Sequence, residues 1–389
     1  MSLAHSPSIV TNGLVLAYDM NNTGRSWMGA PTTNVLVDTN DLSTGNWAYT
    51  LFGNWPATGA TANAASDPNG QLTATKVNAS GYSRFQRYAV SANVTYTFSL
   101  WVRNISMTAS VALRIATGLN GTLVAYSYAT YISLSSDWAR YSVSVTIPAS
   151  GVNQIEVGID VSSNYPNSNV YLHVWKPQLE VQSFATPFVS GTRSNARALL
   201  DLTGQNTLTA SSLTYVSDNT FSLNGTGDYI SCGNLGAWFS QGTVSFWMYS
   251  TAVENYRNPF TTHYVGGNTG LRFEQNSAGT FGAVYGNDAG TYNGFSFLAS
   301  GLQANTWYHV TSTWNTGTNT VIGYLNGVEK FNSANTYWAT TMPSVTFGNG
   351  FSGTRYFTGK LPNAQIYNRV LTATEVAQNF QAIRGRYGV

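Results

Sequence analysis

The sequence has few charged residues and a single cysteine. Lys, Arg, Asp and Glu make up 9% of its 389 residues, against roughly 25% in a typical soluble domain. The formal net charge is +2 and the basic residues form no runs, which argues against a nucleic-acid-binding surface. Cys232 stands alone, so the chain has neither an internal disulfide nor a zinc site built from cysteines. It also has no apolar stretch of membrane length, so no membrane insertion is expected.

The sequence also lacks a recognisable catalytic constellation. Its four histidines are scattered without metal-ligand spacing, and neither a phosphate-binding loop nor a nucleophile elbow is present. Glycoside hydrolysis needs two cooperating carboxylates. Glu156 and Asp160 have the parity to share a strand face, but no other acid accompanies them. We interpret them as solvated or salt-bridged residues, and we predict that the protein is not an enzyme.

What the chain does contain is strand-forming sequence separated by polar, turn-rich runs. Residues 96–103, 141–147 and 170–175 each alternate apolar and polar side chains, which is typical of half-buried strands. Ser, Thr, Asn, Gly and Tyr are abundant throughout. The pattern predicts an all-β protein of sandwich type, and 389 residues predict more than one domain at roughly 100–200 residues each.

The segment 357–380, FTGKLPNAQIYNRVLTATEVAQNF, predicts a strand, a turn and a short helix. Asn363 and Gln365 are expected to face out from this strand. Thr372 followed by Glu375 forms a capping box, in which each side chain accepts from the other residue's backbone N–H. Apolar residues then recur at helical spacing, so the helix should lie on the sheet that it follows.

Three stretches resemble one family of folds. The closing run GKLPNAQIYNRVLTATEV is similar to the final signature of laminin-G-like, concanavalin A-type jelly rolls. TWYHVTSTWN at 306–315 and IGYLNGV at 322–328 resemble that family's central strand and its Asn-Gly hairpin. The chain departs from the family at Pro362-Asn363, where members often carry Ile-Asp. No role is therefore transferred from that acidic residue.

The same family's pattern is split along the chain. GLVLAYD at 13–19 resembles its opening strand, but the expected continuation comes only with LDLTGQN at 200–206 and LNGTGDYI at 223–230. The simplest account is a laminin-G-like jelly roll, residues 1–33 plus 193–389, interrupted by an inserted domain at 34–192. Insertion is tolerated at an exposed loop whose ends lie close together.

The inserted segment resembles the carbohydrate-binding-module-like jelly rolls of phage structural proteins. Its last residues, QLEVQSFATPFV at 178–189, are similar to the closing sequence of those modules. The resemblance implies a second β-sandwich and a virion setting.

Strand parity selects the first candidates for a binding surface. If the alternating apolar residues face a core, two indoles, a guanidinium, a phenol and an imidazole share the opposite face: Trp101, Arg103, Tyr171, His173 and Trp175. Sugar C–H faces stack on aromatic rings while amide, hydroxyl or guanidinium groups bind the hydroxyls. The alternative is that the neighbouring jelly roll or another subunit covers this face.

Other aromatic residues lie in turn-rich stretches. Trp47 and Trp55 precede the first long strand of the insert and form one cluster of candidates. Tyr256 and Tyr285 lie in two expected loops of the laminin-G-like part. Calcium is a further candidate ligand of these loops, through Asp288 and backbone carbonyls. A single Asp is a weak ligand set, because calcium prefers several carboxylates, and no cofactor is otherwise expected.

Three classes of function remain open. The first is a bacteriophage virion-surface structural protein, a capsid decoration or short head fibre, that binds host polysaccharide without cleaving it. The second is a tail-fibre or receptor-binding adhesin, although the chain has no coiled-coil heptads or fibre repeats. The third and least favoured is a polysaccharide-degrading enzyme.

The virion classes imply particular partners and a location. The expected partners are other virion proteins and further copies of the chain, with a trimer expected by analogy with phage fibres. The start, MSLAHSPSIVTNG, is polar and shows no secretory leader. We therefore expect synthesis in the host cytoplasm and a place on the virion surface.

Overall fold

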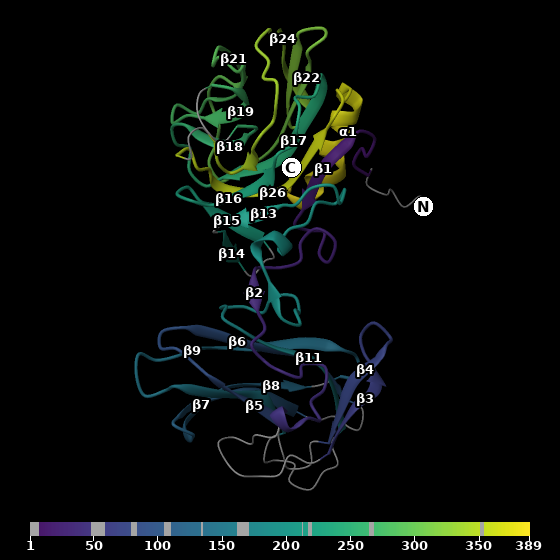
Figure 1. Ribbon diagram of the computed structural model, residues 1–389, viewed down its shortest axis with the longest axis vertical. Helices are drawn as coiled ribbons and strands as arrows, with labels where there is room; N and C mark the ends of the chain where they lie inside the picture. The colour runs from purple at the N-terminus through teal and green to yellow at the C-terminus, as the bar shows by residue number, and fades with distance from the viewer. Residues whose placement is uncertain are drawn as a thin grey trace. The chain divides into compact units, whose positions relative to one another are not determined.

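The computed structural model describes residues 8–47, 59–78, 84–104, 110–133, 135–161, 171–211, 213–216, 220–263, 268–350 and 354–389. The chain divides into two compact units (Figure 1). The split unit comprises Met1–Ala30 and Ser194–Val389, and the central unit comprises Pro31–Arg193. The fold is all-β with a single α-helix among the described residues, as the sequence predicted. In that part of the chain no helix is long and apolar enough to span a membrane.

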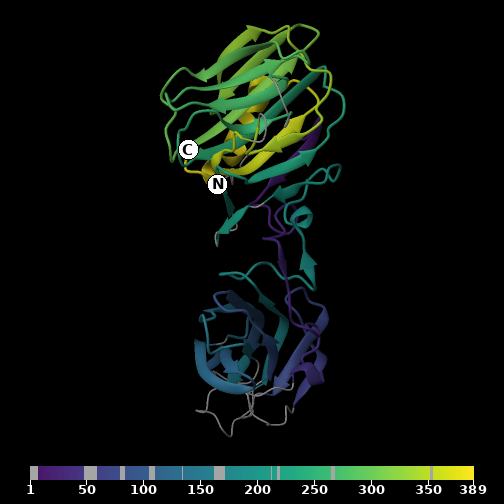
Figure 2. The ribbon, with the colours of Figure 1, turned by 60° about the vertical axis from the view of Figure 1, so that its left-hand side comes forward.

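The split unit contains two antiparallel sheets in separate layers (Figure 2). Eight of the described strands form the first sheet, in the order β14-β15-β26-β17-β22-β23-β24 with β1 also on β26. Their bounds are β1 Leu14–Asp19, β14 Thr214–Val216, β15 Thr220–Asn224, β17 Gln241–Ser250, β22 Trp307–Asn315, β23 Thr320–Leu325, β24 Val328–Ala334 and β26 Thr358–Tyr367. The Asn326-Gly327 turn between β23 and β24 has φ angles of +52° and +77°, which confirms the predicted tight hairpin.

Seven described strands form the second sheet of the split unit, in the order β13-β16-β25-β18-β19-β20-β21. Their bounds are β13 Thr209–Ser211, β16 Tyr229–Gly233, β18 Arg257–Thr261, β19 Gly270–Gln275, β20 Phe281–Gly286, β21 Tyr292–Leu298 and β25 Val345–Phe347. Aromatic rings from both sheets fill the space between them. Phe246 of β17 meets Phe273 of β19 edge-on, with ring centroids 5.1 Å apart.

Helix α1, Ala373–Ile383, lies on the outer side of the first sheet near β1 and β26 (Figure 1). The predicted capping box is confirmed, because Thr372 Oγ1 accepts from Glu375 N at 3.3 Å and Glu375 Oε2 accepts from Thr372 N at 2.9 Å. Phe380 is buried and stacks on Trp247 of β17, with ring centroids 5.7 Å apart. The short 3-10 turns are η1 Gly45–Trp47, η2 Asn195–Arg197 and η3 Arg384–Arg386.

The central unit has its own pair of sheets. Its described strands are ordered β3-β4-β11-β6-β9 and β5-β10-β7-β8, with a short β2–β12 ribbon. The bounds are β2 Thr32–Thr33, β3 Ala60–Ser66, β4 Leu72–Asn78, β5 Arg84–Ala89, β6 Thr95–Asn104, β7 Ser110–Leu119, β8 Thr122–Ser133, β9 Ala139–Thr146, β10 Gln154–Val161, β11 Tyr171–Glu180 and β12 Thr192–Arg193. Phe98 and Leu172 from the first sheet and Leu113 and Ile155 from the second are fully buried in one core.

A buried carboxylate joins the two parts of the split unit. Asp201, after the central unit, accepts hydrogen bonds from Ala17 N in β1 at 2.9 Å, Thr203 N at 3.1 Å and Asn206 N at 3.0 Å. Burial alone would raise the pKa of Asp201, but these bonds and those from the Thr203 and Asn206 side chains outweigh it and lower the pKa. The ionised form therefore stabilises the seam between β1 and the returning chain.

We expect Asp201→Asn to destabilise the split unit by about 1–3 kcal/mol at pH 7, since the amide replaces an acceptor with a donor that faces other donors. The folded pKa of Asp201 lies below its unfolded value of about 3.9. Its contribution is thus complete above that value and is lost as pH falls through the folded pKa. Urea unfolding at pH 7 and pH 3 should show the gap between wild type and variant narrowing in acid. A gap that is absent at pH 7, or constant with pH, contradicts this role.

Candidate functional site

Strands β6 and β11 bring the first set of predicted residues together. The two strands pair antiparallel, with Trp101 opposite Trp175 and Arg103 opposite His173. Val102 and Val174, which alternate with them, are buried in the core of the central unit. The structure thus places Trp101, Arg103, Tyr171, His173 and Trp175 on the outer face of the five-stranded sheet.

The paired residues contact each other closely. The Trp101 and Trp175 rings meet edge-on with centroids 6.5 Å apart, and Trp175 Nε1 donates to Thr73 Oγ1 at 2.9 Å. Arg103 Nε donates to His173 Nδ1 at 3.1 Å. Trp175 and His173 are only 7% and 9% exposed, whereas Trp101 and Arg103 are half-buried. Trp101 is therefore the more accessible of the two indoles.

Trp138, which was not among the predicted residues, belongs to the same face. The Arg103 guanidinium lies 5.0 Å from the centre of its ring, and Trp138 Nε1 donates to Ser66 O at 3.2 Å. Its outward direction could have been predicted by extending the alternation of residues 141–147 towards the N-terminus. Arg140, opposite Trp101, and Trp138 two residues earlier have the outward parity.

A β-bulge directs a lysine onto this face. The pairing of β6 with β11 shifts register between Trp175 and Gln178, and Lys176 there has a φ of +49°. Its Nζ lies 3.9 Å from the centre of the Trp175 ring. Lys76 of β4 occupies the corresponding place over Tyr171, at 4.2 Å. Bulges of this kind reorient single side chains. We call these residues the cation-aromatic face: Lys76, Trp101, Arg103, Trp138, Arg140, Tyr171, His173, Trp175 and Lys176.

The electrostatic surroundings keep the histidine of this face neutral. Burial, followed by the positive charges of Arg103 and Lys76, lowers the pKa of His173 to about 4. Because Nδ1 accepts from Arg103, the neutral ring carries its proton on Nε2. His173 is thus a hydrogen-bond donor at pH 7 without being a cation.

The remaining predicted binding residues are not brought together. Trp47 is fully buried in the core of the central unit, and its Nε1 donates to Asp38 O at 3.1 Å; a surface role for it was wrong. Tyr285 was also wrongly expected in an exposed loop. It lies in β20 with its ring in the core and its hydroxyl 2.8 Å from Ser312 Oγ. Tyr256 is 54% exposed, and Trp55 lies outside the described residues.

The acidic residues are engaged in local contacts. Glu156 is fully buried and ion-paired to Arg87 at 2.6 Å, consistent with the salt-bridged interpretation. Asp288 accepts from Thr340 Oγ1 at 2.7 Å, which occupies the carboxylate considered for calcium. Within the described ranges, no three His, Cys, Asp or Glu side chains are grouped closely enough to hold a metal ion.

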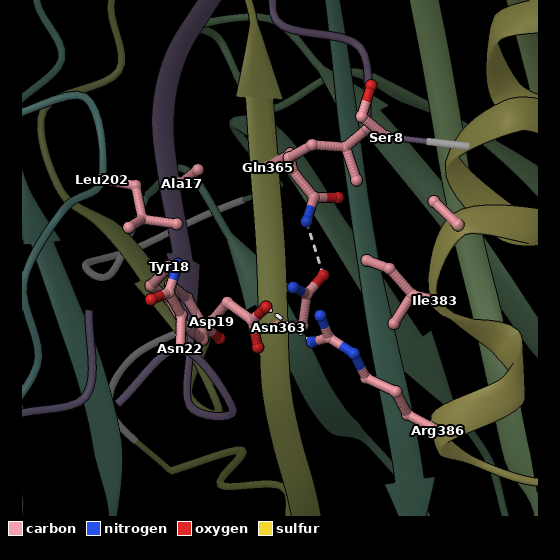
Figure 3. Close-up of a pocket in the computed structure, with 12 residues that line it drawn as sticks. Ser8, Ala17, Tyr18, Asp19, Asn22, Leu202, Asn363, Gln365, Ile383 and Arg386 are labelled. Carbon is pink, nitrogen blue, oxygen red and sulfur yellow. Dashed lines mark hydrogen bonds and ion pairs between the residues drawn. The ribbon is translucent and has the colours of Figure 1, made fainter. Parts of the chain in front are cut away.

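A cavity of about 220 Å³ lies in the split unit between β1, β26 and the C-terminal residues (Figure 3). Gln365 Nε2 donates to Asn363 Oδ1 at 2.5 Å, and Arg386 pairs with Asp19 at 2.6 Å. Asn363 and Gln365 do face away from the sandwich core, yet each is only 1% exposed. The predicted outward direction is therefore confirmed, but the C-terminal residues cover this face. Gln365 Oε1 has no hydrogen-bond partner among the described residues, so it offers an acceptor to water or a small hydroxyl-bearing molecule.

Comparison with known proteins identifies the fold of one stretch. Residues 224–377 match the family model described as the concanavalin A-like lectin/glucanases superfamily. The split unit therefore contains a concanavalin A-like jelly-roll domain, as the sequence motifs predicted. No curated protein sequence matches the chain.

Solved structures similar to the chain include bacterial toxin domains. The botulinum neurotoxin type G receptor-binding domain is 16% identical, with a TM-score of 0.39 over 47% of this chain and 48% of that one. The binding domain of paraclostridial mosquitocidal protein 1 is 18% identical, with a TM-score of 0.38 over 47% and 49%. The botulinum neurotoxin serotype D domain, solved with N-acetylneuraminic acid, is 18% identical, with a TM-score of 0.39 over 49% of each chain. The chain thus spans about half the length of these relatives.

Proposed function

We propose that the protein is a bacteriophage virion-surface structural protein, of the capsid-decoration or short head-fibre type, that binds host surface glycans without cleaving them. The observation that carries the binding role is the cation-aromatic face. Trp101 offers a half-buried indole, and Arg103 and His173 offer donors beside it. An aromatic ring next to several fixed donors is the combination that recognises a sugar ring and its hydroxyls.

The two glutamates of the central unit, Glu156 and Glu180, are held by the protein's own groups, which supports binding over hydrolysis. Glu180 accepts from Gln178 Nε2 at 2.7 Å, Thr186 N at 2.9 Å and Thr186 Oγ1 at 2.6 Å. Glu156 is held by Arg87. Both acids are fully buried, and their oxygens are engaged by donors of the protein itself. A glycosidase instead presents two carboxyl groups to the scissile bond.

The virion setting explains how weak binding would suffice. Single-site affinity for a glycan is expected near millimolar, equivalent to about −4 kcal/mol. Many copies on one particle raise the effective affinity without new contacts. The proposal therefore includes association with other virion proteins and a homo-oligomer, with a trimer as the working model. Electron micrographs in which the labelled protein lies on the tail of the particle would instead indicate a tail adhesin.

We expect Trp101→Ala to weaken glycan binding about fivefold or more, since one stacked ring contributes about 1 kcal/mol beyond area burial. The measurement is a titration of purified bacterial surface polysaccharides against the full chain, followed by calorimetry. Trp307→Ala is the matched control, because Trp307 is a half-buried indole of the split unit. A folded Trp101→Ala protein that binds as tightly as wild type would remove this face as the site. Release of reducing sugar would overturn the non-catalytic role.

A further inference from the structure

The aromatic rings of the cation-aromatic face are partly occupied by the protein's own cations. Lys176 lies over Trp175, Lys76 over Tyr171 and Arg103 over Trp138, at 3.9, 4.2 and 5.0 Å from the ring centres. A ring face that holds a cation cannot stack on a pyranose at the same time. At Tyr171, Trp138 and Trp175 the protein therefore offers a ligand the charged group that covers the ring, and not the bare aromatic face.

The order of side chains across the sheet spaces these charges. Lys76, His173 and Arg103 form one row, because Lys76 pairs with His173 and His173 with Arg103. Neighbouring strands are about 4.8 Å apart, so the two cations stand on strands roughly 10 Å apart with the neutral His173 between them. In the adjacent row, Trp175 is followed by Trp101 and then Arg140.

Two of the four cations have a carboxylate nearby: burial lowers the pKa values of Lys176 and Arg140, and the charges of Asp67 and Glu180 partly oppose this shift. Asp67 is 6% exposed and accepts from Asn69 N at 2.7 Å and Gln71 N at 3.1 Å within its own turn. Glu180 is fully buried among Gln178 and Thr186. In the described part of the chain, Lys76, Arg103, Arg140 and Lys176 form no ion pair, including with the exposed Asp137 that precedes Trp138.

Such a cluster is unusual in a protein in which only 9% of residues are charged. Like charges on one face repel, which destabilises the folded state unless an anion is bound. All four cations are half-buried, so their fields are less screened than those of fully exposed groups. We infer that the cation-aromatic face selects acidic glycans, which bear carboxylate or phosphate groups, over neutral ones. This specificity rests on the proposed glycan-binding function.

In this arrangement the acidic group lies between Lys76 and Arg103 and accepts from their charged N–H groups and from His173 Nε2. Such charge-assisted hydrogen bonds are about twice as strong as neutral ones. Trp101, whose ring meets Trp175 edge-on, takes the sugar ring in the next row.

The experiment compares one polymer with and without its charge. Oligogalacturonate and the same oligomer after reduction of its carboxyl groups are titrated against the full chain, and phosphomannan tests the phosphate source. We expect oligogalacturonate or phosphomannan to bind at least about tenfold more tightly than the neutral oligomer, and to weaken as salt is raised. Lys76→Gln with Arg103→Gln should lower acidic-glycan affinity about tenfold or more and largely remove the preference for the charged oligomer over the reduced one. Lys330→Gln with Arg384→Gln, on exposed positions of the split unit, is the charge-matched control.

Each outcome decides between the two proposals. Equal binding of charged and reduced oligomers, with loss in Trp101→Ala, overturns the acidic specificity and leaves glycan binding intact. Binding of neither class overturns both. If the test and control variants lose binding equally, the attraction is a non-specific one for polyanions, and the specificity is overturned. The same conclusion follows if dextran sulfate and DNA bind as tightly as the acidic glycans. Near-ultraviolet circular dichroism confirms that each variant is folded. If the double variant unfolds, Lys76→Gln alone replaces it, because Lys76 is half-buried at the edge of the row.

Discussion

Replacing Phe246 with alanine is expected to lower the free energy of unfolding of the split unit by about 3–5 kcal/mol. Phe246 is fully buried in β17, and its ring meets those of Phe273 and Phe347 in the opposite sheet, with centroids 5.1 and 5.9 Å apart. The substitution leaves a cavity between two sheets that are held apart by their other rings, so the space collapses only partly.

Differential scanning calorimetry can separate this effect from the central unit, whose transition should not move. Phe246→Leu is the matched control, and it should cost less than about 1.5 kcal/mol because most of the volume is kept. An alanine variant within 1 kcal/mol of wild type would show that this aromatic cluster is not the core of the cooperative unit.

Residues 31–193 expressed alone are expected to form a soluble domain that unfolds in one cooperative transition. Their core is closed by their own strands, with Phe98, Leu113, Ile155 and Leu172 all fully buried. This experiment tests the inserted-domain hypothesis, which proposes that the central unit folds independently within the split jelly roll. An unfolded fragment would contradict the hypothesis.

The complementary deletion removes residues 1–30 from the full chain. We expect the transition of the split unit to be lost and that of the central unit to persist. Strand β1 pairs with β26 along Leu14–Asp19, buries Leu16 and Tyr18 in the core of the split unit, and carries the Tyr18 hydroxyl that donates to Leu361 O at 3.0 Å. Equal destabilisation of both transitions would show instead that the two units unfold as one.

Much of the local structure was predictable because it depends on residues close together in sequence. The Thr372–Glu375 capping box and the Asn326-Gly327 hairpin use side-chain chemistry and backbone preferences that act within a few residues. The alternation in β6 and β11 likewise put Trp101, Arg103 and His173 on one side, because side-chain direction in a strand has a period of two.

The errors in the candidate site share a physical cause. Tyr285 was assigned to a loop because glycines and polar residues surround it, but β20 alternates Phe281, Ala283 and Tyr285 into the core. Trp47 lies in a turn-rich stretch and is nevertheless enclosed by the central unit. In both cases local composition indicated exposure, while strands distant in sequence supplied the burial.

The all-β class, the concanavalin A-like motifs of the split unit, the C-terminal helix and the parity of the strand residues can be predicted from local sequence, since propensity and periodicity are local properties. What covers each face depends on long-range packing. Packing buries Asn363 and Gln365 beneath the C-terminal residues. It pairs β1 with β26, although the central unit separates the two strands in sequence. It also places Lys76, Arg103 and Lys176 over aromatic rings. Periodicity states which side a residue points to, whereas exposure and charge environment depend on which remote strand or side chain packs there.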